Sequence, residues 1–159
     1  MSLSQEDRST LANAFAAAMP TIEAMVHAYC EKAGAPERFG IALFDASDAG
    51  ADYLTGGDPA ARTIAEQRIT RADWGERNYL ETAQRKTRGA LRTGRDSGDL
   101  VRNAKELFQE GDATNPGACL GEVAGHPICV ATSGLRGTED EPFALLVIQL
   151  MNRLTAPPA

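Results

Sequence analysis

The chain has 159 residues, of which 43% are hydrophobic and 24% are charged, and its formal net charge is −6. A chain of this length can bury its apolar side chains around one core, so we expect a single domain over residues 1–159 with a frayed tail at 155–159. No apolar run approaches the roughly 18 residues that cross a bilayer, and the N-terminus has no secretory leader pattern. The composition therefore excludes a membrane-spanning protein, and it predicts a soluble, cytoplasmic protein that does not bind membranes.

Positive charge is concentrated in the middle of the chain. Residues 62–105 contain eleven Lys and Arg against six Asp and Glu, whereas the rest of the chain contains five against sixteen. Such asymmetry can mark a nucleic-acid surface, but this segment has one Trp and one Tyr for stacking and matches no known binding module. We predict no nucleic-acid partner, and interpret the segment as a solvated helix face or as a local anion site.

The first predicted element is a long amphipathic helix from near Ser4 to Ala33, ended by Gly34. Pro20 interrupts its hydrogen bonding without changing the apolar phase. His27 lies beside the apolar stripe, where a hydrogen-bonded histidine is more common than a metal or haem ligand. The stripe itself repeats every three or four residues and consists of Leu11, Phe15, Met19, Ile22, Val26 and Tyr29.

The next segments read as a hairpin followed by helices. The apolar run at 39–45 and the run at 51–55 are separated by Gly and Ser, which is typical of two paired strands. Residues 60–93 are mostly helix formers, so we predict helix there, with a break near 73–76. After a turn at 94–98, residues 99–108 predict a further short helix.

The C-terminal part predicts two strands and a helix. Residues 118–123 and 128–133 are apolar runs separated by the four residues 124–127, which suits a second hairpin. Residues 143–154 form a helical pattern headed by the acidic Asp140 and Glu141. Hairpins with covering helices give an α+β class, in which an antiparallel sheet is flanked by helices.

The second hairpin concentrates residues capable of chemistry. In a register that pairs Val123 with Ile128, Cys119 and Cys129 point to opposite faces of the sheet, so we predict no metal site there. Ser133 lacks the first glycine of a nucleophile elbow, although hydrolysis by Ser133, His126 and Asp140 stays formally open. The three cysteines (Cys30, Cys119 and Cys129) all lie in apolar stretches, which predicts reduced, buried thiols.

Two segments resemble the GlcG/HbpS-like family, also called the haem-degrading domain family. They are KTRGALRTGRDSGDL at 86–100 and PGACLGEVAGHPICVATSGLRGTEDEPFALLVIQL at 116–150. The matching features are a lysine in an alanine-rich helix, a Ser turn, a Gly-rich strand, a strand ending in Ser-Gly, and an acidic helix start. The positions that carry them are Lys86, Asp96, Ser97, Gly117, Thr132, Ser133, Gly134, Glu139 and Asp140.

The resemblance implies a profilin-like sheet of about five antiparallel strands flanked by helices, and assembly into a homo-oligomer. It also implies a small-molecule ligand, since some members bind haem or related tetrapyrroles. We place the candidate ligand site near the Ser133-Gly134 turn, with Lys86 or Arg85 pairing a ligand carboxylate and His126 as a further candidate. Adjacent helical residues diverge by about 100°, so Arg85 and Lys86 are not both expected to face one ligand, and each is more typical of a solvated charge.

Three classes of function stay open at this point. The first is a non-catalytic module that binds haem or another small anion. The second is an enzyme that processes haem or a small organic acid, and the third is a structural partner of another enzyme. Neither the cofactor nor the catalytic residues follow from the sequence.

Overall fold

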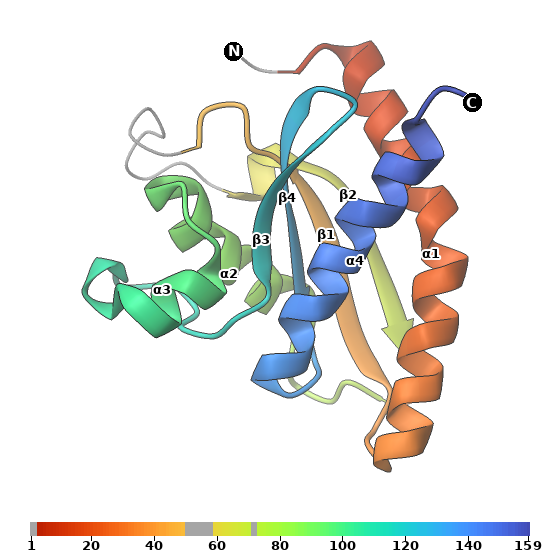
Figure 1. The fold of residues 1–159 in the computed structure, drawn as a ribbon. Coiled ribbons are helices and arrows are strands. Elements are labelled where there is room, and N and C mark those ends of the chain that lie inside the picture. The colour runs from red at the N-terminus through yellow and green to blue at the C-terminus, as the bar shows by residue number, and fades with distance from the viewer. Residues whose placement is uncertain (1–2, 50–58, 71–72) are drawn as a thin grey trace.

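The computed structural model describes residues 3–49, 59–70 and 73–159 and has three layers, with helices on both faces of an antiparallel sheet (Figure 1). Its elements are α1 (Gln5–Ala33), β1 (Arg38–Asp45), β2 (Thr63–Thr70), α2 (Tyr79–Thr93), α3 (Ser97–Asn103), β3 (Ala118–Val123), β4 (His126–Ser133) and α4 (Gly137–Thr155). Short 3₁₀ turns at Pro59–Arg62 and Lys105–Leu107 precede β2 and follow α3. The predicted α+β class is confirmed.

The sheet has the strand order β2-β1-β4-β3 within the described residues, with every pairing antiparallel. The prediction was about five strands, and the described part of the chain contains four. β1 pairs with β2 and β4. The run at 51–55, which we predicted to pair with β1, lies outside the described residues.

Residues 63–70 form a strand, so the prediction of a helix beginning at residue 60 is wrong. Ala65, Glu66 and Gln67 favour helix locally, but β-branched residues at both ends of the segment (Thr63, Ile64, Ile69 and Thr70) favour strand. Pairing with β1 through seven residue pairs decides the outcome, because a backbone ladder outweighs weak local propensity. The helix begins only at Tyr79, after Asn78 caps it by accepting a hydrogen bond from the Glu81 N–H.

The β3–β4 turn is shorter than predicted. Only Ala124 and Gly125 connect the strands, with φ of 51° and 80°, as a type I′ hairpin turn requires. His126 therefore lies in β4 opposite Val123, where we expected Ile128. The observed register therefore differs from the predicted one by two residues. Because side chains alternate between the two faces of a sheet, each residue still lies on its predicted face.

Two hydrophobic cores fill the space between the layers. One lies between the sheet and the pair α1 and α4, and contains Cys119 and Val130. The other lies between the sheet and α2, and contains Cys129 and Ala131. The prediction that Cys119 and Cys129 lie on opposite faces is confirmed, and all three cysteines are buried free thiols.

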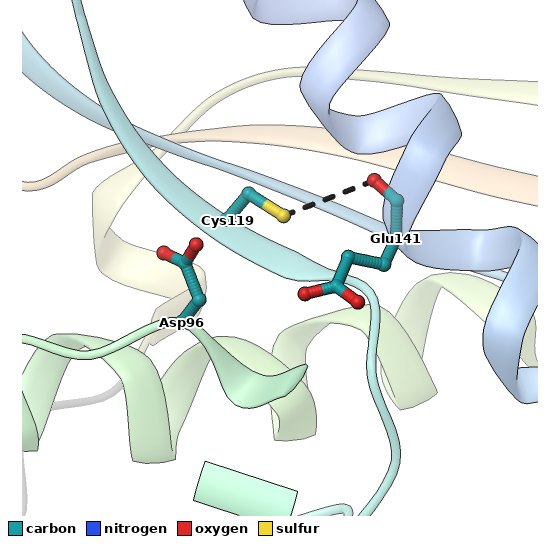
Figure 2. Close-up of side chains that lie close together, drawn as sticks. All are labelled: Asp96, Cys119 and Glu141. Carbon is teal, nitrogen blue, oxygen red and sulfur yellow. Dashed lines mark hydrogen bonds between the residues drawn. The ribbon is translucent and has the colours of Figure 1, made fainter. Parts of the chain in front are cut away.

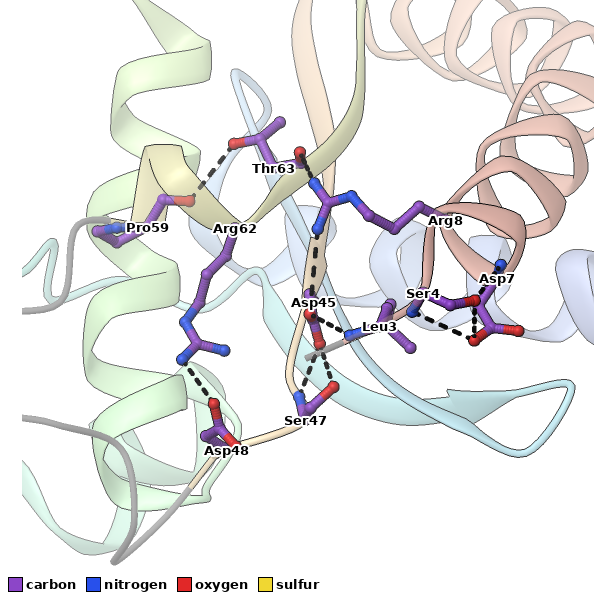
Figure 3. Close-up of polar contacts among 10 residues, drawn as sticks. All are labelled: Leu3, Ser4, Asp7, Arg8, Asp45, Ser47, Asp48, Pro59, Arg62 and Thr63. Carbon is purple, nitrogen blue, oxygen red and sulfur yellow. Dashed lines mark hydrogen bonds and ion pairs between the residues drawn. The ribbon is translucent and has the colours of Figure 1, made fainter. Parts of the chain in front are cut away.

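Polar contacts hold the start of α1 against the strand ends (Figure 3). Ser4 and Asp7 form a reciprocal capping box, which satisfies free N–H groups of the first helical turn. Arg8 donates from Nη2 to the Thr63 carbonyl oxygen at 2.8 Å and lies 4.0 Å from the Asp45 carboxylate. These contacts fix α1 at the edge where β2 begins. The last helix, α4, starts at Gly137, six residues before the predicted apolar run.

Candidate functional site

A buried ion pair joins α2 to the start of α4. Lys86 Nζ donates to Asp140 Oδ2 and to the Thr132 carbonyl oxygen, both at 2.8 Å. The two charged side chains are only 2% and 3% exposed. The expectation that Lys86 is a solvated surface charge is therefore wrong.

The pattern of α2 explains why Lys86 is inside. Its buried residues recur at helical spacing, and most of them are small, which lets the helix approach the sheet closely. They are Ala83, Lys86, Thr87, Gly89, Ala90 and Leu91. Lys86 belongs to this stripe by position, which is a signal that the sequence contained. A Cβ at Gly117 would lie 2.9 Å from Lys86 Nζ, so glycine there gives the ammonium its space.

Asp140 organises the turn between β4 and α4. Its Oδ1 accepts a hydrogen bond from the Leu135 N–H at 3.1 Å, and its carbonyl oxygen accepts one from the Thr132 hydroxyl at 2.6 Å. Burial raises the pKa of the Asp140 carboxyl to about 6, against the opposing effect of Lys86. The carboxylate is thus ionised at neutral pH and takes up a proton in mildly acidic solution.

Both residues of this ion pair line a cavity of about 470 Å³, which we call the lysine cavity. Polar groups dominate its wall, and the basic side chains outnumber the acidic ones by three to two. Its lining residues are Arg77, Asn78, Tyr79, Glu81, Thr82, Arg85, Lys86, Asn115, Ser133, Gly134, Leu135 and Asp140.

Four of the five residues predicted for the ligand site meet in this cavity, namely Arg85, Lys86, Ser133 and Gly134. Arg85 and Lys86 both line it, contrary to the expectation from their divergence on the helix. The exposed Arg85 also donates from Nε to the Gly111 carbonyl oxygen at 3.1 Å, whereas Lys86 is buried. Two residues that diverge on a helix can line one cavity when it extends from the buried side to the exposed side.

His126, the fifth predicted residue, lies elsewhere. It is seven residues from Ser133 on the same strand, roughly 23 Å at about 3.3 Å per residue. Its Nε2 lies 3.3 Å from Asp7 Oδ1 on the surface. The catalytic set of Ser133, His126 and Asp140 is therefore not formed, and the second histidine, His27, bonds to Glu37 at 2.9 Å.

Residues that the sequence reasoning missed also line the lysine cavity. Arg77 comes from the segment before α2, and Asn115 comes from the loop before β3. Neither belongs to a motif, and only the packing of the loops around α2 brings them together.

A second polar cluster lies between α3, β3 and α4, where Asp96, Cys119 and Glu141 place ligand atoms within 4.8 Å of one another (Figure 2). The acidic groups already have partners. Glu141 accepts two hydrogen bonds from Arg102 at 2.9 and 3.1 Å, and Asp96 accepts one from the Leu120 N–H at 2.8 Å. Burial raises the pKa of the Cys119 thiol, which keeps the sulfur protonated. We interpret the cluster as a contact that joins three elements.

Comparison with known proteins identifies the fold. No family model matches the chain, and no curated protein matches it. Solved structures do match: a double variant of HbpS from Streptomyces reticuli has 17% identity and a TM-score of 0.55, covering 99% of this chain and 89% of that one. Protein ORFY of Klebsiella pneumoniae has 12% identity and a TM-score of 0.54, covering 85% and 88%. A PduOC:haem complex has 16% identity and a TM-score of 0.54, covering 96% of each chain.

The chain therefore has the fold of the GlcG/HbpS-like proteins, as the sequence motifs predicted. The structure also contains no helix, among the residues it describes, that is long and apolar enough to cross a membrane.

Proposed function

We propose, on the premise of this shared fold, that the protein is a non-catalytic module that binds a small anionic molecule in the lysine cavity. The observation that carries the proposal is the buried Lys86 at the cavity wall, with Arg85 and Arg77 beside it. A lysine ammonium has three donors, and its two hydrogen bonds to Asp140 and Thr132 leave one for a ligand. Ser133 adds a hydroxyl, and Gly134 leaves the backbone accessible.

Haem is one candidate ligand, because one structural neighbour is a haem complex. The basic groups of the cavity suit the carboxylates of a haem. Its described lining residues offer the iron no imidazole, thiolate or thioether, and of the usual protein ligands to haem iron they include only the phenol of Tyr79. The donor set thus favours recognition of the anionic groups over ligation of the metal, and a small organic acid satisfies it equally well.

Binding without catalysis fits the polar groups present. A serine nucleophile needs a base within hydrogen-bond distance, and neither histidine of the chain lines the cavity with Ser133. Asp140 is already engaged by Lys86 and by the Leu135 N–H.

Calorimetric titration with a small monocarboxylate, together with absorbance titration with haemin, tests the proposal. We expect saturable binding of at least one probe, and a loss of about tenfold in affinity for Arg85→Met, because a charge-assisted contact is removed. Arg88→Met is the matched control, since Arg88 lies on the same helix and does not line the cavity. Non-saturable changes with both probes, or equal effects of the two variants, would contradict the proposal.

A further inference from the structure

A second cavity of about 320 Å³ adjoins the lysine cavity, and we call it the arginine cavity. Both cavities are lined by Tyr79, Gly134 and Leu135, so the turn after β4 forms their common wall. Its remaining lining residues come from the end of α1, the start of β1 and the turn before α4: Tyr29, Ala33, Gly34, Ala35, Pro36, Arg38 and Arg136.

Gly134 makes this arrangement possible. Its φ is 124°, which side chains rarely tolerate, and a Cβ there would overlap the Arg38 carbonyl oxygen. The turn therefore lies directly against the start of β1. The Gly134 backbone is shared by the walls of both cavities, together with Tyr79 and Leu135, so the two cavities are neighbours at this turn.

The arginine cavity is lined by two arginines, Arg38 and Arg136. Among the residues that the structure describes, no carboxylate forms an ion pair with Arg38 or with Arg136. Arg38 Nε is also buried and has no hydrogen-bond partner in the described part of the chain. Buried donors are nearly always paired in folded proteins, with protein groups or with water, so this N–H is available to an acceptor that enters the cavity. The acid recorded nearby is Glu139, which acts on Tyr29 and is not among the lining residues.

The rest of the arginine cavity is more apolar than the lysine cavity. Ala33, Ala35 and Pro36 contribute aliphatic surface, and the rings of Tyr29 and Tyr79 contribute aromatic surface. Such a wall suits a hydrocarbon segment with a charge at its end. A ligand that supplies an acceptor to Arg38 would thus also have apolar character.

We infer that the two cavities are halves of one site, whose ligand is a dicarboxylate with an apolar linker between its anionic groups. One carboxylate binds at Lys86 and Arg85, and the other binds at Arg38 and Arg136. The inference rests on the proposed function for the first half and on Arg38 and Arg136 for the second.

Titration with linear α,ω-dicarboxylic acids of four to ten carbons, each compared with its monomethyl ester, tests this. We expect one chain length to bind at least about tenfold more tightly than its ester, because the second carboxylate gains charge-assisted hydrogen bonds. Arg38→Met and the surface variant Arg136→Met should each reduce that advantage, because they weaken binding of the diacid more than binding of the ester. Arg153→Met, an exposed arginine at the end of α4, is the control.

The outcomes separate the two proposals. Binding of the esters without any advantage for the diacids, or an advantage that survives Arg136→Met and a folded Arg38→Met, overturns the inference and leaves the proposed function standing. Failure of esters, diacids and haemin alike overturns the proposed function as well. Thermal melting of each variant establishes that it is folded.

Discussion

The two ends of β4 have similar polar residues and very different surroundings. At its start, His126 lies near Asp7 with side chains that are 29% and 36% exposed. At its end, beside Thr132 and Ser133, Lys86 and Asp140 form an ion pair that is almost fully buried and borders the lysine cavity. The first end closes in a two-residue hairpin, whereas the second meets α2, α4 and β1. The cavities lie where segments distant in the sequence converge, and proximity in sequence alone does not produce such an arrangement.

The largest expected effect is at the buried end. Replacing Lys86 with alanine leaves the Asp140 carboxylate and the Thr132 carbonyl group buried without their partner, which typically destabilises a protein by about 3–5 kcal/mol. Urea denaturation measures this difference. Arg85→Ala should change the free energy of unfolding by less than about 1 kcal/mol, because that side chain is exposed. Equal effects of the two variants would remove the distinction between buried and surface charge on α2.

The second prediction concerns pH. The pKa of Asp140 is raised to about 6, so lowering the pH from 7.5 to 5 protonates this carboxyl and removes a negative charge from the lysine cavity. Sulfate keeps the same charge over this range, so its affinity should rise when the negative charge of Asp140 is lost. We expect a rise of about tenfold, which corresponds to roughly 1.4 kcal/mol of binding free energy. Calorimetry at several pH values measures it.

The matched variant for the pH experiment is Asp140→Asn, which is neutral at every pH. Its affinity for sulfate should stay flat between pH 7.5 and 5, near the wild-type value at pH 5. A wild-type affinity that is independent of pH, or a variant that follows the wild-type curve, would show that Asp140 does not control the charge of the cavity.

The smallest effect is expected at the start of β4. His126→Ala should change stability by less than about 1 kcal/mol, because exposed ion pairs contribute little. It should also leave affinity for carboxylates and haemin unchanged, since His126 does not line either cavity. Weaker binding by this variant would support the prediction that His126 contacts the ligand. It would also contradict the proposed difference between the start and the end of β4.

Much of the fold could be predicted because it depends on local periodicity. The apolar stripe of α1, its start near Ser4 and its end at Gly34 were predicted from the sequence and are all present in the structure. The strands around Cys119 and Cys129 were equally clear, and their faces were predicted correctly in spite of a wrong turn length. Side chains in a strand alternate between the two faces of the sheet, so a register error of two residues leaves each side chain on its predicted face.

The candidate site was predictable only in part. The motifs pointed to Lys86, Ser133 and Gly134, but local statistics for lysine favour an exposed side chain, and Arg38 belongs to no motif at all. Arg38 is brought to the Gly134 turn by the β1–β4 pairing, in which Gly40 lies opposite Ser133 across more than ninety residues of sequence.

The sequence by itself determined the class of fold, the helix α1 and the β3–β4 hairpin, because each depends on spacing within a short segment. Only the tertiary structure decided that residues 63–70 form a strand, that Lys86 is buried with Asp140, and that His126 lies far from both. These outcomes depend on contacts between segments distant along the chain, and their free energies outweigh the local preference of any one segment.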